Sequence, residues 1–263
     1  MPSPMLDAPC PGWKRDLPGP TDPPKALGGP EQPPNYLDGI YLELSRRSSS
    51  VRGTFVVTVP LCAYAFIWQL TIAIRYDWFS SGDMTDRLIA LFVIALCSAG
   101  YFYLAAFLYH IDVSTPRDLP IRFNRVRRRI YVYGFHQVWW NPFGGRYATT
   151  ASHDWNDVRA EVWEQWGPTA GGGLIIKWGV SIAIVKPGTN EVLERFHLST
   201  YNKDLDNLWA YVCTYMQQGP DALPPCDIEP RDANDVPAYN LALRWAPLVE
   251  WPEAMDIESR SAP

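Results

Sequence analysis

Two apolar stretches determine the architecture: TFVVTVPLCAYAFIWQLTIAI from Thr54 to Ile74 and LIALFVIALCSAGYFYLAAFLY from Leu88 to Tyr109. Neither stretch contains Asp, Glu, Lys, Arg or His. A helix needs about 20 residues to cross a hydrocarbon core about 30 Å thick, and a water-soluble helix of that length would carry charge on its outer face. The sequence therefore predicts a membrane protein with a two-helix transmembrane hairpin in residues 46–112, with spans at about 54–74 and 88–109.

Arginines are distributed unevenly around these spans. Arg75 and Arg87 flank the connecting loop, whereas nine arginines flank the opposite ends. Those nine are Arg46, Arg47, Arg52, Arg117, Arg122, Arg125, Arg127, Arg128 and Arg129. Because Lys and Arg accumulate in cytoplasmic loops, we expect a bacterial inner (plasma) membrane protein with both termini in the cytoplasm. Gln69 is the only strongly polar side chain within the spans, so we expect anchoring helices rather than a pore or transporter.

The first 45 residues are rich in proline, with eleven prolines between Met1 and Tyr36. They offer little material for a core, so we expect a disordered or polyproline-like tail. The alternative interpretation is a docking site for a proline-recognising partner.

Residues 117–219 have the pattern of a water-facing β-rich domain, because apolar and polar residues alternate or β-forming residues cluster in short runs. The predicted strands are 121–126, 129–135, 158–166, 174–178, 180–185 and 192–198. Apolar residues then recur at helical spacing from Leu205 to Met216, before Gly219-Pro220. We therefore predict an α+β fold: a transmembrane helical hairpin followed by an antiparallel, pleckstrin-homology-like domain closed by a C-terminal amphipathic helix, although α+β sandwiches share this element order.

The remaining residues, 220–263, form an acidic, proline-containing tail, with nine acidic residues against three arginines after Gly219. One short helix is expected around Tyr239 to Trp245. The whole chain has a formal net charge of -5 and no dominant basic stripe, so no nucleic-acid partner is expected.

The sequence contains no strong catalytic or metal-binding motif. The close pairs His153-Asp154 and His110 with Asp112 lack the geometry of a catalytic dyad or the spacing of metal ligands. Asp157 and Glu161 are expected on a solvated strand face. Gly171-Gly-Gly173 lacks the Lys and the Ser or Thr of a phosphate-binding loop. No catalytic residue, cofactor or metal is therefore predicted.

Two groups of residues are candidates for contact with the membrane surface. Arg125, Arg127, Arg128 and Arg129 form a basic run close to the second span, where each arginine contributes about 1 kcal/mol toward anionic headgroups. The simpler explanation of these arginines is that they set the orientation of the spans in the membrane. Trp139 and Trp140, in the stretch WWNPF, would lie on the membrane surface, form a binding patch, or pack beneath a loop.

Three stretches resemble a known family: IRFNRVRRRIYV from Ile121, WNDVRAEV from Trp155, and LWAYVCTYMQQGPDALP from Leu208. Together with the two spans, they look like an uncharacterised proteobacterial membrane family with a domain of unknown function, often encoded near type VI secretion genes. The likeness covers about residues 40–225. A weaker likeness, in the strand pattern and the closing helix, points to bacterial pleckstrin-homology-like membrane proteins. Neither family supplies an active site.

These observations lead to three hypotheses of function. The preferred one is a non-enzymatic inner-membrane protein whose cytoplasmic domain binds a protein partner, as an immunity or accessory factor associated with type VI secretion. The alternative is a lipid- or membrane-surface-sensing pleckstrin-homology-like module, held to the leaflet by the arginine run and the tryptophan pair. An enzyme acting on the membrane is the third, for which the sequence nominates no residue. The expected partners are the lipid bilayer and a secretion component or toxin.

Overall fold

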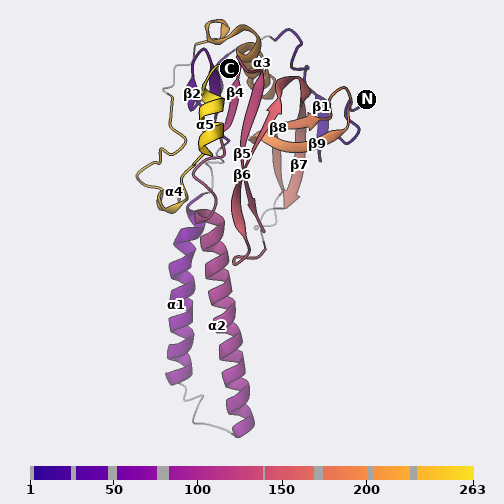
Figure 1. The fold of residues 1–263 in the computed structure, drawn as a ribbon. Coiled ribbons are helices and arrows are strands. Elements are labelled where there is room, and N and C mark those ends of the chain that lie inside the picture. The colour runs from indigo at the N-terminus through magenta and orange to yellow at the C-terminus, as the bar shows by residue number, and fades with distance from the viewer. Residues whose placement is uncertain are drawn as a thin grey trace.

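The computed structural model describes residues 3–24, 28–46, 52–75, 83–138, 140–168, 174–200, 204–225 and 230–263. The chain has an α+β fold in which two long helices project from a body of two antiparallel sheets (Figure 1). The strands are β1 (Trp13–Asp16), β2 (Tyr36–Leu37), β3 (Tyr41–Leu44), β4 (Ile121–Asn124), β5 (Arg129–Gln137), β6 (Arg146–Asp154), β7 (Val158–Pro168), β8 (Leu174–Val185) and β9 (Val192–Thr200). The α-helices are α1 (Thr54–Arg75), α2 (Met84–Val113), α3 (Leu205–Gln218), α4 (Leu241–Trp245) and α5 (Glu253–Arg260).

Helices α1 and α2, the helical hairpin, are long and apolar enough to cross a membrane. They include both predicted spans, and α2 extends four residues beyond the expected span at each end. Little of their apolar surface is covered by the rest of the chain: side chains such as Val57, Phe92 and Leu96 are more than half exposed. A continuous apolar surface of this kind needs a cover other than water.

The helical hairpin interrupts a pair of neighbouring strands. Strand β3 precedes α1 and β4 follows α2, yet the two strands pair in antiparallel register, with Leu44 opposite Ile121. They belong to a five-stranded sheet of order β2-β3-β4-β5-β6, and a four-stranded sheet has the order β1-β7-β8-β9. The two ends of the helical hairpin are therefore connected to two neighbouring, paired strands (Figure 1).

The predicted strands of residues 117–219 are present, with one fusion and one omission. The two runs from 174 to 185 form the single strand β8. The sequence pattern does not reveal β6, because RYATTASHD mixes small, polar and charged residues without alternation. Strand β6 is an edge strand that pairs along its whole length with β5, and tertiary pairing rather than local pattern makes it a strand.

The N-terminal residues correct the expectation of a disordered tail. Strand β1 pairs with β7, and β2 and β3 complete the five-stranded sheet. The proline-rich residues between these strands receive hydrogen bonds from core indoles: Trp209 Nε1 donates to the Pro18 carbonyl at 2.8 Å, and Trp155 Nε1 to that of Pro20 at 3.3 Å. Few apolar residues suffice here, because this segment covers an existing core rather than building its own.

The core lies between the two sheets and α3. Trp155 and Trp209 are fully buried within it and lie 5.5 Å apart, and Trp155 also meets the Phe123 ring edge to face. Asp204 caps α3 by accepting a hydrogen bond from the Asn207 backbone, and the apolar face of α3 packs on both sheets. We call β1–β9 and α3 the sheet domain.

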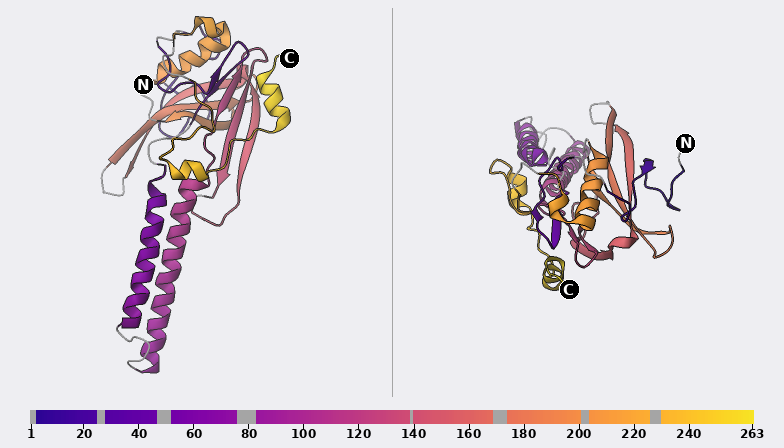
Figure 2. Two further views of the ribbon diagram at one scale, coloured as in Figure 1. Left: turned by 90° about the vertical axis from the view of Figure 1, so that its left-hand side faces the viewer. Right: turned by 90° about the horizontal axis from the view of Figure 1, so that it is seen from above.

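The C-terminal residues are more ordered than the predicted acidic tail. Helix α4 coincides with the short helix expected near Trp245, and it lies where the helical hairpin meets the sheet domain (Figure 1). Helix α5 was not expected, because its sequence EAMDIESR is mostly polar. It packs against the outer face of β4, as the view in Figure 2 shows from a second side.

Candidate functional site

The basic run lies far from the helical hairpin. Residues 125–128 form the turn between β4 and β5, and β5 extends nine residues, about 30 Å, from this turn toward the helices. Figure 1 shows the C-terminus and α5 at that distant end of the sheet domain. The expectation that Arg125, Arg127, Arg128 and Arg129 contact the membrane surface is corrected, because the short strand β4 runs away from the end of α2.

Three of these arginines bind other parts of the chain instead. Arg127 donates to the Ser261 and Ala262 carbonyls at 3.0 and 2.9 Å, Arg129 pairs with Glu258 at 3.2 Å, and Arg128 donates to Asn156. The basic turn thus holds the acidic C-terminal helix.

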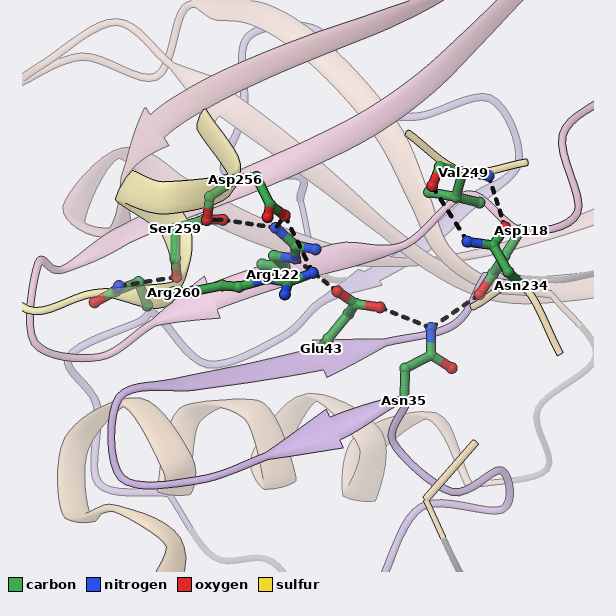
Figure 3. A network of polar contacts seen from close by, with 10 residues as sticks. Asn35, Glu43, Asp118, Arg122, Asn234, Val249, Asp256, Ser259 and Arg260 are labelled. Carbon is green, nitrogen blue, oxygen red and sulfur yellow. Dashed lines mark hydrogen bonds and ion pairs between the residues drawn. The ribbon is translucent and has the colours of Figure 1, made fainter. Parts of the chain in front are cut away.

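A buried arginine on β4 makes the strongest of these contacts. Arg122 is 2% exposed; its Nε lies 2.6 Å from Glu43 on β3 and its Nη1 lies 2.7 Å from Asp256 on α5. Ser259 accepts a further hydrogen bond from Nη1 (Figure 3). The guanidinium also lies over the Trp251 ring, 4.4 Å from its centroid. Since each charge is paired within the domain, we assign this network a structural rather than a catalytic role.

Beside Arg122, Figure 3 shows a second polar cluster around Asp118. Asn35 donates to both Glu43 and Asp118 at 3.0 Å, which joins the two clusters. Asp118 is 2% exposed and also accepts hydrogen bonds from the Ser45 hydroxyl and the Arg46 backbone. The segment that leads from β3 to α1 is therefore fixed to the segment that leads from α2 to β4.

A polar collar, formed by Arg52 and Asp112, joins the open ends of the two long helices. Arg52 donates to the carbonyl of Asp112, in the last turn of α2, and to those of Thr115 and Pro116, just beyond it. In the reverse direction, the Asp112 carboxylate accepts a hydrogen bond of 2.8 Å from the Val56 backbone in the first turn of α1. A cation at a helix C-terminus and an anion at a helix N-terminus both complement the helix dipole.

Above the collar is a cavity of about 320 Å³, lined by the two collar residues together with Arg46, Phe55, Arg117 and Asp118 among others. Arg46 donates to the Leu119, Tyr133 and His197 carbonyls, and burial lowers its pKa to about 10 against the opposing effect of Asp118. Arg117 donates to the Asn234 and Arg244 carbonyls. Because these arginines donate to backbone carbonyls, they connect the segments around the cavity, where the long helices meet the sheet domain.

Replacing Asp112 by alanine is expected to lower the free energy of unfolding by about 1–2 kcal/mol, because α1 loses the acceptor at its N-terminus. Asp112→Asn keeps an acceptor oxygen and should cost less. Urea unfolding of the detergent-solubilised protein would measure both, and hydrogen exchange at the Val56 amide would locate the effect. Equal, negligible losses for the two variants would contradict this role for the carboxylate.

The tryptophan pair is described in part, since Trp139 lies outside the described residues. Trp140 is 58% exposed and its carbonyl accepts a hydrogen bond of 2.5 Å from the Tyr103 hydroxyl on α2. This connection between β5 and β6 therefore lies at the end of the sheet domain beside α2, whereas the arginine run lies at the other end. The sequence places both groups near the second span, and only the direction of β5 separates them.

The remaining titratable groups show no cluster of three or more His, Cys, Asp or Glu side chains suited to a metal among the described residues. His153 lies 3.2 Å from Glu194 on β9, and burial lowers its pKa. Glu161 corrects the expectation of a solvated strand face: it is fully buried, pairs with Arg195 at 2.9 Å and accepts a hydrogen bond from the Cys10 backbone. It secures the N-terminal segment to β7.

Cys10 and Cys213 are buried, and burial raises the pKa of each thiol to about 12. A raised pKa favours the protonated thiol in the folded state, so its contribution to stability is complete below about pH 9 and is lost as the pH rises toward 12. At pH 8 we expect iodoacetamide to modify both residues only after denaturation, because about one thiol in ten thousand is ionised. Peptide mass mapping would check this, and modification of the folded protein would contradict it.

Comparison with known proteins yields one match. The model of a family of unknown function (DUF6708) matches residues 98–263, which take in the second half of α2 and all later strands and helices. This match confirms the expected domain of unknown function in that general form. No curated protein and no solved structure matches the chain.

Proposed function

The chain belongs to the DUF6708 family of unknown function, and we propose that it is a non-enzymatic inner-membrane protein that holds a protein-binding domain on the cytoplasmic face. In this proposal α1 and α2 cross the bilayer, the sheet domain and both termini are cytoplasmic, and the loop that connects the two spans faces the periplasm. The arginine distribution around the spans supports this orientation.

One observation carries the two-span proposal: the apolar helical hairpin is inserted between two strands that pair. Because β3 and β4 form one sheet, residues 44 and 121 lie on the same side of any membrane, so the chain must cross it an even number of times between them. The exposed apolar surfaces of α1 and α2 account for two crossings. The collar residues then lie at the boundary, where helix ends meet the polar phase.

The polar side chains of the two main clusters bind other parts of the chain, which supports a binding rather than a catalytic role. The strongest polar cluster, around Arg122, joins β3, β4 and α5, and the collar joins α1 to α2. We infer further that β4–β9 with α3 form a pleckstrin-homology-like arrangement. The support is the element order: two antiparallel sheets, then a helix whose apolar face packs on both.

Topology reporters test the proposal. A periplasm-active enzyme and a cytoplasm-active fluorescent protein would be fused in turn after Pro263 and within the loop near Gly82. Fluorescence at the C-terminus and enzyme activity at the loop are expected. Enzyme activity at the C-terminus would overturn the orientation, and extraction of the chain from membranes by alkaline carbonate would overturn membrane insertion.

The identity of the partner stays a prediction, which rests on the resemblance to a family found near type VI secretion genes. Crosslinking in native membranes followed by mass spectrometry of the captured proteins is the direct test. A secretion component or toxin is expected. A stable complex that contains neither would count against an immunity or accessory role.

A further inference from the structure

We propose that residues 140–145, the hairpin tip between β5 and β6, form a third membrane-contacting element, whose aromatic side chains insert among the lipids of the cytoplasmic leaflet beside α2. The inference rests on the proposed function in one respect, that α1 and α2 cross the bilayer. It adds that the sheet domain also contacts the membrane directly, through its β5–β6 hairpin. The descent of the β5–β6 hairpin along α2 is visible in Figures 1 and 2.

The depth of the hairpin tip follows from its contacts with α2. The Tyr103 hydroxyl donates to the Trp140 carbonyl at 2.5 Å, and the Phe143 ring stacks on Phe102 with centroids 6.1 Å apart. Tyr103 precedes the end of α2 at Val113 by ten residues, which is about 15 Å along a helix axis. Since the polar collar lies at that end, the hairpin tip extends well below the level of the headgroups if α2 crosses the membrane.

Six backbone groups of the hairpin tip are hydrogen-bonded within the protein, as an environment without water requires. In lipid, each peptide group must find a partner within the protein. The Trp140 carbonyl is bound by Tyr103, the Asn141 carbonyl by the Gly144 amide, and the Pro142 carbonyl by the Arg146 guanidinium. The Asn141 amide donates to the Val138 carbonyl, its side chain accepts from the Phe143 amide, and proline has no amide hydrogen. These bonds give partners within the protein to the carbonyls of residues 140–142 and to the amides of Asn141, Phe143 and Gly144.

The two aromatic side chains of the hairpin tip, Trp140 and Phe143, are exposed. Phe143 is 62% exposed and Trp140 58%, although each lies beside α2. Phe102, the stacking partner of Phe143, is itself exposed on the face of α2. The hairpin tip therefore continues the exposed apolar surface of the transmembrane helix, and the same lipid covers both. This continuity favours lipid over a separate protein as the occupant.

A polar boundary lies at the base of the hairpin tip. Arg146 Nη1 lies 2.9 Å from Nδ1 of His110, near the end of α2. The sequence has no charged residue from Val138 to Gly145, and the first charge is Arg146. An arginine with tryptophan and phenylalanine below it is the arrangement of an interfacial anchor, in which the cation stays at the headgroups and the rings extend about 5–10 Å inward.

Two other hairpin turns of the sheet domain differ in chemistry. The β4–β5 turn contains Arg125, Arg127 and Arg128, and the β8–β9 turn, KPGTNE, contains Lys186 and Glu191. Both suit water. The contrast is sharpest at the two ends of β5, where a basic turn lies far from the helical hairpin and an aromatic turn lies against it.

Fluorescence quenching in vesicles tests the inference on the full chain. An environment-sensitive probe would be attached to Phe143→Cys, in a background where Cys62, Cys97 and Cys226 are serine. The matched control is Val126→Cys in the turn at the opposite end of β5, and Leu96→Cys in the middle of α2 is the membrane control. The protein would be reconstituted in phosphatidylethanolamine and phosphatidylglycerol, with either a nitroxide-labelled lipid or aqueous iodide as quencher.

We expect the lipid quencher to reduce emission at Phe143→Cys at least about threefold more than at Val126→Cys, and iodide to show the reverse order. Iodide quenching at Phe143→Cys with lipid quenching at Leu96→Cys would overturn the insertion and leave the two-span proposal standing. Absence of lipid quenching at Leu96→Cys would overturn the proposed function itself. A probe shielded from both quenchers would mean that a second copy covers the hairpin tip, which also contradicts the proposal. Trp140→Cys, in the same background, guards against a local defect caused by loss of Phe143.

Discussion

Replacing Arg122 by leucine is expected to lower the free energy of unfolding by about 3–5 kcal/mol, because the change leaves a buried carboxylate without its cation. Glu43 is 7% exposed, and Arg122 is its ion-pair partner in the network of Figure 3. The substitution also removes the ion pair with Asp256 and the stacking over Trp251, so α5 should separate from β4.

Urea unfolding in detergent, followed by tryptophan fluorescence, measures the loss, and hydrogen exchange across residues 253–260 reports the release of α5. Arg129→Gln is the matched control, since that pair with Glu258 is half-exposed and should contribute less than about 1 kcal/mol. The double variant Arg122→Leu, Glu43→Leu should recover part of the loss because no charge stays buried. If Arg122→Leu alone lowered the free energy of unfolding as little as Arg129→Gln, this would contradict a buried ionic network.

Trp155→Ala should destabilise the protein by about 3–5 kcal/mol through the cavity that it leaves. The indole is fully buried where the two sheets meet α3, in contact with Phe123 and Trp209, and it donates to the Pro20 carbonyl. The loss should therefore expose the N-terminal segment as well as the core.

Thermal unfolding and limited proteolysis of the N-terminal segment would check this expectation. Trp166→Ala provides the control, because Trp166 is 62% exposed near the end of β7 and its truncation should change stability by less than about 0.5 kcal/mol. Similar effects of the two substitutions would show that Trp155 is not a joint between the sheets and α3.

The parts of the fold that the sequence predicts are those that local pattern decides. Helices α1 and α2 follow from hydropathy, and α3 follows from its spacing and the Asp204 cap. Strands β1 to β3 are two to four residues long, and β6 lacks alternation, so pairing with distant strands determines them. Local propensity has little influence on such elements.

The candidate site shows the same division. Arg122 belongs to the polar face of the alternating stretch IRFN, and it is buried because α5, 134 residues later, covers that face. The sequence singles out the aromatic residues of the β5–β6 connection, but their depth depends on the length and direction of β5. The arginine run is close to α2 in sequence and distant from it in space for the same reason.

The position of the helical hairpin between β3 and β4 also sets an order of events during synthesis. Glu43 leaves the ribosome 79 residues before its partner Arg122, and at about 5–20 residues per second this interval is about 4–16 s. Through that interval β3 can pair with β2 but lacks β4, its neighbour on the other side, while both long helices are synthesised. If the two helices insert into a membrane as they are synthesised, as proposed, insertion precedes the pairing of β3 with β4, and a delay at the translocon would prolong the time in which this edge of β3 is open to chaperones or to mispairing.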